Sequence, residues 1–333
     1  MSGTEALVRL LLEQSRIDRL NGLRTKGLVS GYPGSPLGGL DIALGKAKAF
    51  LDEEGIHFQP AVNEELAATA LWGSQHINLY DNPDIQGVFS MWYGKGPGLD
   101  RAMDALRHAN QGGVAPHGGM VIAVGDDPTG KSSTLAYQSD QNFHSLGIPY
   151  FFPKNVSDII PMGLEAFALS RYSGCCVGLK IVVDTADSNA VVDMSKLRPS
   201  LPILKPNSLV HVTKHDPASV RESKLHDVRL PAVQTWCENS ENVAQVYLPA
   251  KKGETRLGII GVGKIANEVN EALAGLLPDR GKKNTVAFTA INMPWPLPEK
   301  KISTMLSVVE EVLVIEEKRS FVEEQIAKIC LKQ

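Results

Sequence analysis

Cysteine is scarce in this chain and is not spaced for metal binding. There are four cysteines, of which two are adjacent and two are isolated: Cys175, Cys176, Cys237 and Cys330. Zinc sites and iron–sulfur clusters need cysteines, or cysteines with histidines, at short regular spacings. We therefore expect no metal centre of the chain's own, and we expect a reduced protein in the cytoplasm.

The chain also lacks a strong excess of charge and a long apolar run. Its 34 basic and 37 acidic residues leave a formal net charge of −3, which gives no electrostatic reason to expect nucleic acid or an anionic membrane as partner. Hydrophobic residues make up 43% of the chain, but no unbroken run reaches the length of a membrane span. Charges interrupt the apolar stretch at 1–20, which predicts an amphipathic helix and not a secretory signal.

Short apolar runs alternate with amphipathic segments, which indicates an α/β fold. The runs in the first part of the chain are bounded by Gly, Pro or Asp and lie at 27–33, 87–92, 120–125, 149–153 and 178–184. This alternation predicts a largely parallel sheet flanked by helices. In such sheets ligands bind beyond the carboxyl ends of the strands, so the turns after these runs are the places to search for a site.

The composition changes near residue 195. A proline-containing segment at 196–208 predicts a linker, and a polar stretch with helical character follows at about 216–246. A second α/β alternation then runs to the end of the sequence. We expect a first domain at residues 1–200, a linker and connecting helix at 201–247, and a second α/β domain at 248–333.

Residues 125–132, Gly-Asp-Asp-Pro-Thr-Gly-Lys-Ser, fit the pattern of a phosphate-binding P-loop and follow a strand-like run. Such a loop cradles phosphate oxygens with its backbone amides and its lysine. Here Asp126 and Asp127 would lie beside the phosphates and repel them. A P-loop NTPase that uses Gly125–Ser132 is therefore the less favoured alternative, and a polar turn with Lys131 exposed is the structural interpretation.

A second nucleotide-binding pattern, Gly-Val-Gly-Lys-Ile-Ala at 261–266, has the form of a dinucleotide fingerprint. It follows a strand-like run and opens a helix, with Ala266 in place of the third glycine. The next strand-like run, however, does not end in the acidic residue that would hold a ribose. We favour tight packing of helix on strand as the explanation.

Two adjacent acids begin an Ala-rich, almost uncharged helix at 64–75. Asn63 is the expected N-cap, and Glu64 and Glu65 then fall in the first turn, where the helix dipole favours acids. That explanation is sufficient for Glu65, which we expect to be solvated. It is less satisfactory for Glu64, because the helix behind it suits a buried environment.

Several motifs occur together and in order along the chain. They include "SGYPGSPLGGLD" (30–41), "VNEELAATALWGSQ" (62–75), "GVFSMWYGKGPGLDRAMDALRHAN" (87–110), "APHGGMVIAVGDDPTGKSST" (115–134) and "VLVIEEKRSFVEEQI" (312–326). As a set they closely resemble the N-terminal part of indolepyruvate ferredoxin oxidoreductases, which are thiamine-diphosphate-dependent 2-oxoacid:acceptor oxidoreductases. The resemblance implies a pyrimidine-binding domain followed by a transketolase C-terminal-like domain, with no bound dinucleotide.

The resemblance also implies roles for particular residues. Glu64 lies nine residues before Gly73, the spacing at which thiamine diphosphate enzymes place the glutamate that hydrogen-bonds the N1′ atom of the cofactor's aminopyrimidine. The turn with Pro33, Gly34 and Ser35 is expected to meet cofactor and substrate, with the Ser35 hydroxyl beside the 2-oxo acid. The loop residues expected near the pyrimidine are Gly96, Pro97 and Gly98, and the candidates for the substrate carboxylate are Arg107, His108 and His117.

A complete enzyme of this family needs parts that are not evident here. The Gly-Asp-Gly segment that holds the diphosphate with Mg²⁺, and the cysteine runs of ferredoxin-type clusters, are missing from the sequence. We therefore expect a diphosphate-binding domain or subunit as partner, CoA as co-substrate, ferredoxin reached through other subunits, and a homo-oligomer. Trp92 and Tyr93 suit an interface core or an ordinary buried strand equally well. The alternative from another class is a non-catalytic assembly subunit of the same fold.

Overall fold

The structure is a computed structural model that describes residues 1–81, 83–205, 207–248, 256–276 and 286–332. Its first unit has a six-stranded sheet formed by β1 (Thr25–Gly31), β2 (Ile56–Phe58), β3 (Gly87–Lys95), β4 (Met120–Asp126), β5 (Tyr150–Phe151) and β6 (Val177–Val182). The strand order is β2-β1-β3-β4-β6-β5, and every pairing in it is parallel. The expected strand-like runs all contain strands of this sheet, whereas the short edge strand β2 was not expected.

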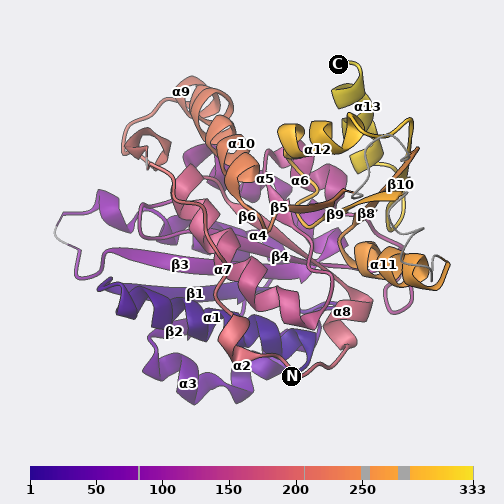
Figure 1. Cartoon of the computed structure of the whole chain (residues 1–333). Coiled ribbons are helices and arrows are strands. Elements are labelled where there is room, and N and C mark those ends of the chain that lie inside the picture. The colour runs from indigo at the N-terminus through magenta and orange to yellow at the C-terminus, as the bar shows by residue number, and fades with distance from the viewer. Residues whose placement is uncertain (82, 206, 249–255, 277–285, 333) are drawn as a thin grey trace.

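Helices cover both faces of this sheet (Figure 1). They are α1 (Gly3–Leu20), α2 (Leu40–Lys46), α3 (Lys48–Glu53), α4 (Glu64–Ser74), α5 (Gly96–Gly112), α6 (Asp140–Leu146), α7 (Val156–Ser173) and α8 (Val183–Asp187), with short 3-10 turns at Ile77–Leu79, Met194–Lys196 and Ser208–Val210. The helix α1 packs against α7, and α4 packs against α5. The N-terminal helix begins at a capping box in which Ser2 and Glu5 bond each other's backbone.

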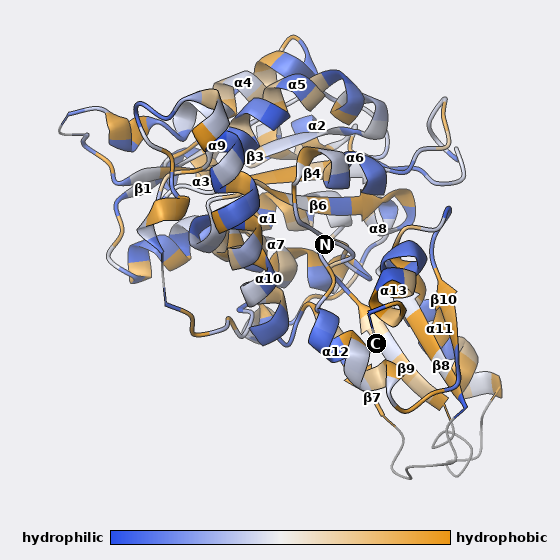
Figure 2. Ribbon diagram, turned by 90° about the horizontal axis from the view of Figure 1, so that it is seen from above, coloured by the Kyte–Doolittle hydropathy of each residue, from blue (hydrophilic) through white to orange (hydrophobic). Residues whose placement is uncertain are grey.

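The alternation of side chains along the central strands explains the two helical layers. In β3, Phe89, Met91 and Tyr93 join the core that also contains α1 and α7, whereas Trp92 joins the core with α4 and α5. Trp92 and Tyr93 are both fully buried within the chain, so they belong to an ordinary buried strand. Figure 2 shows β4 mainly in orange and the outer face of α5 with blue, hydrophilic residues. This pattern is typical of a sheet that is buried on both sides.

The second unit has a smaller sheet in the order β10-β8-β9-β7, in which β7 alone is antiparallel to its neighbour. Its elements are β7 (Ala244–Tyr247), β8 (Leu257–Val262), α11 (Lys264–Leu276), β9 (Val286–Ile291), α12 (Glu299–Leu306), β10 (Glu311–Ile315) and α13 (Val322–Cys330). The strand β7 comes from the segment 201–247 that was expected to connect the domains. The division into 1–200 and 248–333 stays a prediction, and residues 249–255 at that boundary lie outside the described residues.

A helical connection joins the two units and packs on the first. It contains α9 (Ala218–Lys224), a π-helical segment at Leu225–Arg229 (η4) and α10 (Leu230–Asn239). Arg229 is fully buried and donates hydrogen bonds to the carbonyls of Asn110, Gln111 and Gly112 in the last turn of α5, and to Val210. The second sheet shares a hydrophobic core with the α4–α5 face of the first, so the α/β units form one continuous packed body.

Candidate functional site

The carboxyl ends of β1 and β3 face a common pocket at the edge of the larger sheet. The turn 32–37 follows β1, and Lys95 at the end of β3 leads directly into α5. The first turn of α4 lies beside the first turn of α5, because these two helices pack against each other. Parallel strands of this fold class direct their ligands to this edge, as the sequence predicted.

Glu64 lines this pocket and is held there by its own helix start. Asn63 is the N-cap, and its side chain accepts a hydrogen bond from the backbone N–H of Leu66 at 2.8 Å. The indole Nε1 of Trp92 donates to the carbonyl of Glu64 at 3.0 Å, which anchors the helix start to β3. The side chain of Glu64 is only 8% exposed, whereas Glu65 is exposed. The expected N-cap is confirmed.

The carboxylate of Glu64 has no hydrogen-bond donor among the described residues. Its nearest charged neighbour is Arg101 in α5, whose Nε lies 3.7 Å from Oε2 in an ion pair, and the Arg101 side chain is 60% exposed. A buried carboxylate normally accepts several hydrogen bonds, because an unsatisfied charged group costs free energy. The side chain therefore has acceptor capacity left for a ligand.

The pocket above Glu64 has a volume of about 390 Å³. Its lining combines one carboxylate, two cations and an aromatic ring: Tyr32, Val62, Asn63, Glu64, Lys95, Pro97 and Arg101. The size falls within the range of small-molecule sites. Lys95 and Arg101 give the mouth a positive charge beside the acid, so the lining suits a polar heterocycle better than an apolar ligand.

The glycines in the first turn of α5 allow its backbone to approach Glu64 closely. A Cβ atom on Gly98 would lie 2.8 Å from Glu64 Oε1, and one on Gly96 would lie 2.0 Å from the ring of Tyr137. A side chain at Gly96 would collide with the Tyr137 ring, and one at Gly98 would displace the carboxyl end of Glu64. Pro97 lies between them, lines the pocket and stands in the first turn of α5, where a proline is favoured.

Ser35 lies in the turn after β1, three residues beyond Tyr32 of the pocket lining, and is connected to a second loop; it does not itself line the pocket. Its hydroxyl shares a hydrogen bond with the hydroxyl of Ser132, and the hydroxyl of Ser133 donates to its carbonyl at 3.1 Å. Gly34 packs on the stem of Lys95, since a Cβ there would lie 2.8 Å from Lys95 Cδ. Pro33, next to it, is exposed. The turn 33–35 is thus fixed on one side by β3 and on the other by the loop after β4.

The segment 125–132 does not have the geometry of a P-loop. The carboxylate of Asp127 accepts the backbone N–H groups of Lys131, Ser132 and Ser133 at 2.9, 2.7 and 2.8 Å. Although burial raises it, these donors lower the pKa of Asp127 below its ordinary value. The amides that would cradle a phosphate are therefore engaged, and no helix forms in residues 127–139, all of which the structure describes. Lys131 is exposed, as the structural interpretation predicted.

Asp126, the other acid of that segment, belongs to a buried charged group. Lys180 is 2% exposed and lies 2.6 Å from Asp140 and 3.5 Å from Asp126. Burial lowers the pKa of Lys180, but Asp140 and Asp126 raise it above its ordinary value. Burial also raises the pKa of Asp126. This cluster joins the end of β4 and the strand β6 to the start of α6.

Arg107, His108 and His117 are not brought to this pocket. The helix α5 starts at the carboxyl edge of the sheet and runs back across it, so Arg107 lies about three turns away and donates to Ser145. His108 stacks on Trp72. His117 precedes β4 and lies against Gly87, the first residue of β3, at the opposite edge. The hypothesis that these residues contact the substrate carboxylate therefore does not fit their positions.

The glycine pattern at 261–266 forms the turn between β8 and α11. A Cβ atom on Gly261 would lie 2.7 Å from the Cα atom of Ala266, so the helix packs tightly on the strand. This contact accounts for the pattern without a dinucleotide, in agreement with the favoured interpretation.

Sequence reasoning missed Arg101 and the hydroxyls of Ser132 and Ser133 as neighbours of the site. Lys95, which also lines the pocket, was not among the expected site residues. Arg101 follows the glycine loop by one helical turn, and that spacing was the available signal for it. Ser132 and Ser133 carried no such signal, because their contact with Ser35 joins residues almost 100 positions apart.

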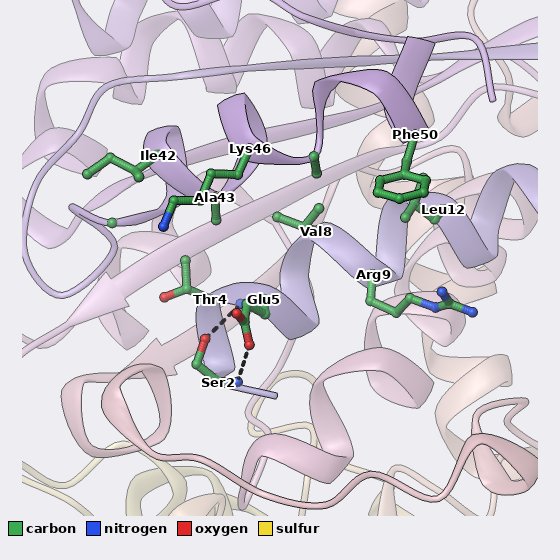
Figure 3. A pocket seen from close by; sticks show the side chains of 12 residues that line it. Ser2, Thr4, Glu5, Val8, Arg9, Leu12, Ile42, Ala43, Lys46 and Phe50 are labelled. Atoms are coloured by element: carbon green, nitrogen blue, oxygen red, sulfur yellow. Dashed lines mark hydrogen bonds between the residues drawn. The ribbon is translucent and has the colours of Figure 1, made fainter. Parts of the chain in front are cut away.

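A larger pocket, of about 520 Å³, lies between α1 and the α2–α3 segment. Figure 3 shows Val8, Ile42 and Phe50 in its wall, with Ser2 and Glu5 joined by the hydrogen bonds of the capping box. Its only lining acid, Glu5, is used in that capping box, and its cations are Arg9 and Lys46. The lining therefore offers no free carboxylate, and we do not assign the site to it.

The part of the chain that the structure describes has no cluster of three or more His, Cys, Asp or Glu side chains arranged to bind a metal ion. No helix in the same residues is both long enough and apolar enough to cross a membrane.

Comparison with known proteins gives a consistent result. Residues 249–332 match the family model of the indolepyruvate oxidoreductase domain. The chain is 25% identical to the indolepyruvate oxidoreductase subunit IorA of Methanothermobacter marburgensis, over 99% of this chain and 48% of the relative. It is 26% identical to the IorA subunit of Pyrococcus abyssi, over 97% of this chain and 46% of the relative. The chain thus spans about half the length of these relatives.

Two solved structures have the same fold. One is the 2-oxoglutarate:ferredoxin oxidoreductase of Magnetococcus marinus with 2-oxoglutarate, coenzyme A and succinyl-CoA bound, with a TM-score of 0.66, 16% identity, and coverage of 99% of this chain and 59% of that one. The other is a split-gene transketolase, described as an inactive β4 tetramer, with a TM-score of 0.61, 11% identity, and coverage of 100% and 86%. Together the comparisons confirm the resemblance of this chain to the indolepyruvate oxidoreductases and its α/β fold.

Proposed function

We propose that this chain is the pyrimidine-binding component of an indolepyruvate-type 2-oxoacid:ferredoxin oxidoreductase. The reaction would convert a 2-oxo acid and CoA into an acyl-CoA and CO₂, with two electrons passed on to ferredoxin. The observation that carries the proposal is the carboxylate of Glu64, which is buried at a helix start, lines a pocket and has no hydrogen-bond donor among the described residues.

The pocket fits the aminopyrimidine of thiamine diphosphate in its chemistry. Glu64 would hold a proton between its carboxyl group and the N1′ nitrogen of the ring, and the glycine at Gly98 leaves room beside its Oε1 atom. When it is bound, thiamine diphosphate supplies the carbanion chemistry that releases CO₂ from a 2-oxo acid. The low exposure of Glu64 strengthens a hydrogen bond and a shared proton at this carboxylate, because little water competes with the ligand.

Ser35 is the residue that we assign to the 2-oxo acid. Its hydroxyl can donate to a keto or carboxylate oxygen, and it stands in the turn that directly follows β1. Its present partner is the hydroxyl of Ser132, which can act as donor or acceptor. Ser35 can therefore turn its proton toward a substrate while Ser132 donates to its oxygen.

We propose that the remaining parts of the site come from elsewhere. The Gly-Asp-Gly segment that the resemblance associates with Mg²⁺ and the diphosphate is not evident in the sequence, which supports a separate domain or subunit that would hold them. The relatives are about twice as long as this chain, which supports such a partner. We propose that ferredoxin is reached through other subunits, that the chain forms a homo-oligomer, and that it works in the cytoplasm.

The test supplies the chain with a diphosphate-binding component, thiamine diphosphate, Mg²⁺, CoA and indolepyruvate, and measures acyl-CoA. The change Glu64→Gln should lower turnover by about 10²-fold or more, because loss of a positioned proton-transfer group costs this much. Glu65→Gln is the matched control, since this exposed neighbour should leave turnover unchanged. A Glu64→Gln variant that turns over like the parent chain would refute the assignment.

A non-catalytic assembly subunit is the second candidate. Two observations favour it: Arg101 already gives Glu64 a structural partner, and the split-gene transketolase of the same fold is described as inactive. In that case the chain should bind the diphosphate-binding component equally well with Glu64 or with glutamine at this position, and no acyl-CoA should form.

A further inference from the structure

The turn between β10 and α13 in the second unit is fastened to a loop of the first unit. The Nζ atom of Lys318 donates hydrogen bonds to the carbonyls of Pro128 and Ala136 at 2.9 and 3.0 Å. These two carbonyls stand at the two ends of the loop 127–138, which leads from β4 to α6. Lys318 therefore connects the two ends of the loop 127–138.

A second, reciprocal contact lies next to the lysine. The side-chain amide of Gln138 donates to the carbonyl of Arg319 at 3.0 Å, and the backbone N–H of Arg319 donates to the Gln138 oxygen at 3.2 Å. Gln138 is only 9% exposed. Because both polar groups of a nearly buried amide are used, this pair holds the loop and the turn at one fixed distance.

The turn itself is well anchored in the second unit. The carboxylate of Glu316 accepts the backbone N–H groups of Phe321, Val322 and Glu323 at 2.8–3.1 Å. It thereby satisfies the free donors at the start of α13, where the helix dipole favours a negative charge. Lys318 and Arg319 thus lie between a strand and a capped helix, so the turn can act as a rigid support.

The loop 127–138 contacts both sides of the proposed site. Through Asp127 it fixes Ser132 and Ser133, whose hydroxyls contact the hydroxyl and the carbonyl of Ser35. Near its other end, Tyr137 packs on Gly96, and its hydroxyl donates to Asp100 in α5 at 2.6 Å. A displacement of this loop would therefore move Ser35 relative to the first turn of α5.

From these contacts we propose that Lys318 and Gln138 are positioning residues that set Ser35 for the 2-oxo acid through the loop 127–138. The second α/β unit would then act on the substrate side of the site without contacting the substrate. This inference rests on the proposed role of Ser35. It also makes the geometry of the site depend on how the second unit is seated.

The first experiment measures the loop without any activity. Lys318→Met keeps the aliphatic stem and removes both hydrogen bonds. Hydrogen exchange of the amides in 127–138 should become about tenfold faster, because removing one or two partly exposed hydrogen bonds makes local opening of the loop easier by about this factor. The control Lys328→Met changes an exposed lysine of α13 and should leave these amides unaltered. Unaltered hydrogen exchange in Lys318→Met would refute the claim that Lys318 holds the loop 127–138 in place.

The second experiment uses the reconstituted enzyme and compares KM with kcat. Lys318→Met should raise the KM for the 2-oxo acid several-fold and change kcat less, and Gln138→Ala should do the same. In a Ser35→Ala background, Lys318→Met should have no further effect on KM, because the residue on which it acts is gone. If Lys318→Met raises the KM equally in the parent chain and in Ser35→Ala, Lys318 does not act through Ser35 and the proposal is refuted.

The two experiments also separate this inference from the proposed function. If the parent chain forms no acyl-CoA with all components supplied, the proposed function fails, while hydrogen exchange still decides whether Lys318 closes the loop. A third outcome can also be distinguished: turnover is present and exchange accelerates, but the KM of Lys318→Met equals that of the parent. Lys318 then holds the loop in place, and the role of the loop in positioning Ser35 is refuted.

Discussion

Arg229 offers the sharpest test of how the connecting helices stabilise the first unit. Its guanidinium is fully buried and donates to four carbonyls, at 2.6 Å to Val210 and at 3.1, 2.7 and 3.1 Å to Asn110, Gln111 and Gly112. Three of these carbonyls end α5, where the helix has no intrahelical donors left and the dipole favours a cation. The change Arg229→Met removes the donors and leaves the carbonyls buried.

The magnitude follows from the acceptors left without partners. Each orphaned buried carbonyl costs about 1 kcal/mol at the low end of the usual range, so four cost about 4 kcal/mol. The methionine recovers about 1 kcal/mol by burying apolar surface. We therefore expect Arg229→Met to lower the free energy of unfolding by about 3 kcal/mol, a large part of the stability of a typical domain.

Urea unfolding followed by far-UV circular dichroism measures this loss as a shift of the midpoint. Arg198→Met is the matched control, because Arg198 is exposed and should change the free energy by less than about 0.5 kcal/mol. Hydrogen exchange in residues 109–113 should accelerate in Arg229→Met and not in the control. A loss below about 1 kcal/mol for Arg229→Met would show that the four hydrogen bonds do not stabilise α5 as argued.

Three further predictions follow from other groups. Lys180→Met should lower the free energy of unfolding, measured in urea, by about 3–5 kcal/mol, because it leaves the buried Asp126 and Asp140 without their cation. Adding Asp140→Asn should restore part of that free energy, and a double variant less stable than the single variant would contradict the pairing. Because the pKa of Asp127 is lowered in the folded chain, its contribution to stability is present above the ordinary value of 3.8 and is lost as the pH falls through the lowered value; acid titration of Asp127→Asn should lack that part of the pH dependence, and an unchanged titration would count against it. Burial raises the pKa of the Cys175 thiol to about 12 and also raises those of Cys176 and Cys237, whereas Cys330 is exposed; a thiol reagent should therefore modify only Cys330 in the folded chain, and modification of a second cysteine without denaturant would be the contrary result.

The sequence was a good guide where the signal is local. Apolar runs bounded by Gly, Pro or Asp located β1, β3, β4, β5 and β6, because a strand buried on both faces needs a continuous apolar segment. The N-cap Asn63 and the burial of Glu64 next to an exposed Glu65 were also predicted correctly. The N-cap and the burial of Glu64 depend only on residues within one or two turns of the same helix.

Other features depend on contacts that local patterns do not encode. Nothing near Arg107 or His117 in the sequence shows to which edge of the sheet they belong, since this follows from the direction in which α5 crosses the strands. The contact of Lys318 with Pro128 joins residues 190 positions apart. The buried Lys180 looked like an ordinary strand residue, because its partners Asp126 and Asp140 come from two other elements.

Gly98 has a consequence for the design of inactive variants. A single added methyl group there would meet Glu64 Oε1 at 2.8 Å, although it changes no charge, no proton donor and no acceptor. Gly98→Ala would therefore push the Glu64 side chain aside, while every reactive group remains in the chain. Comparing it with a variant that lacks the acid separates the position of the carboxylate from its presence.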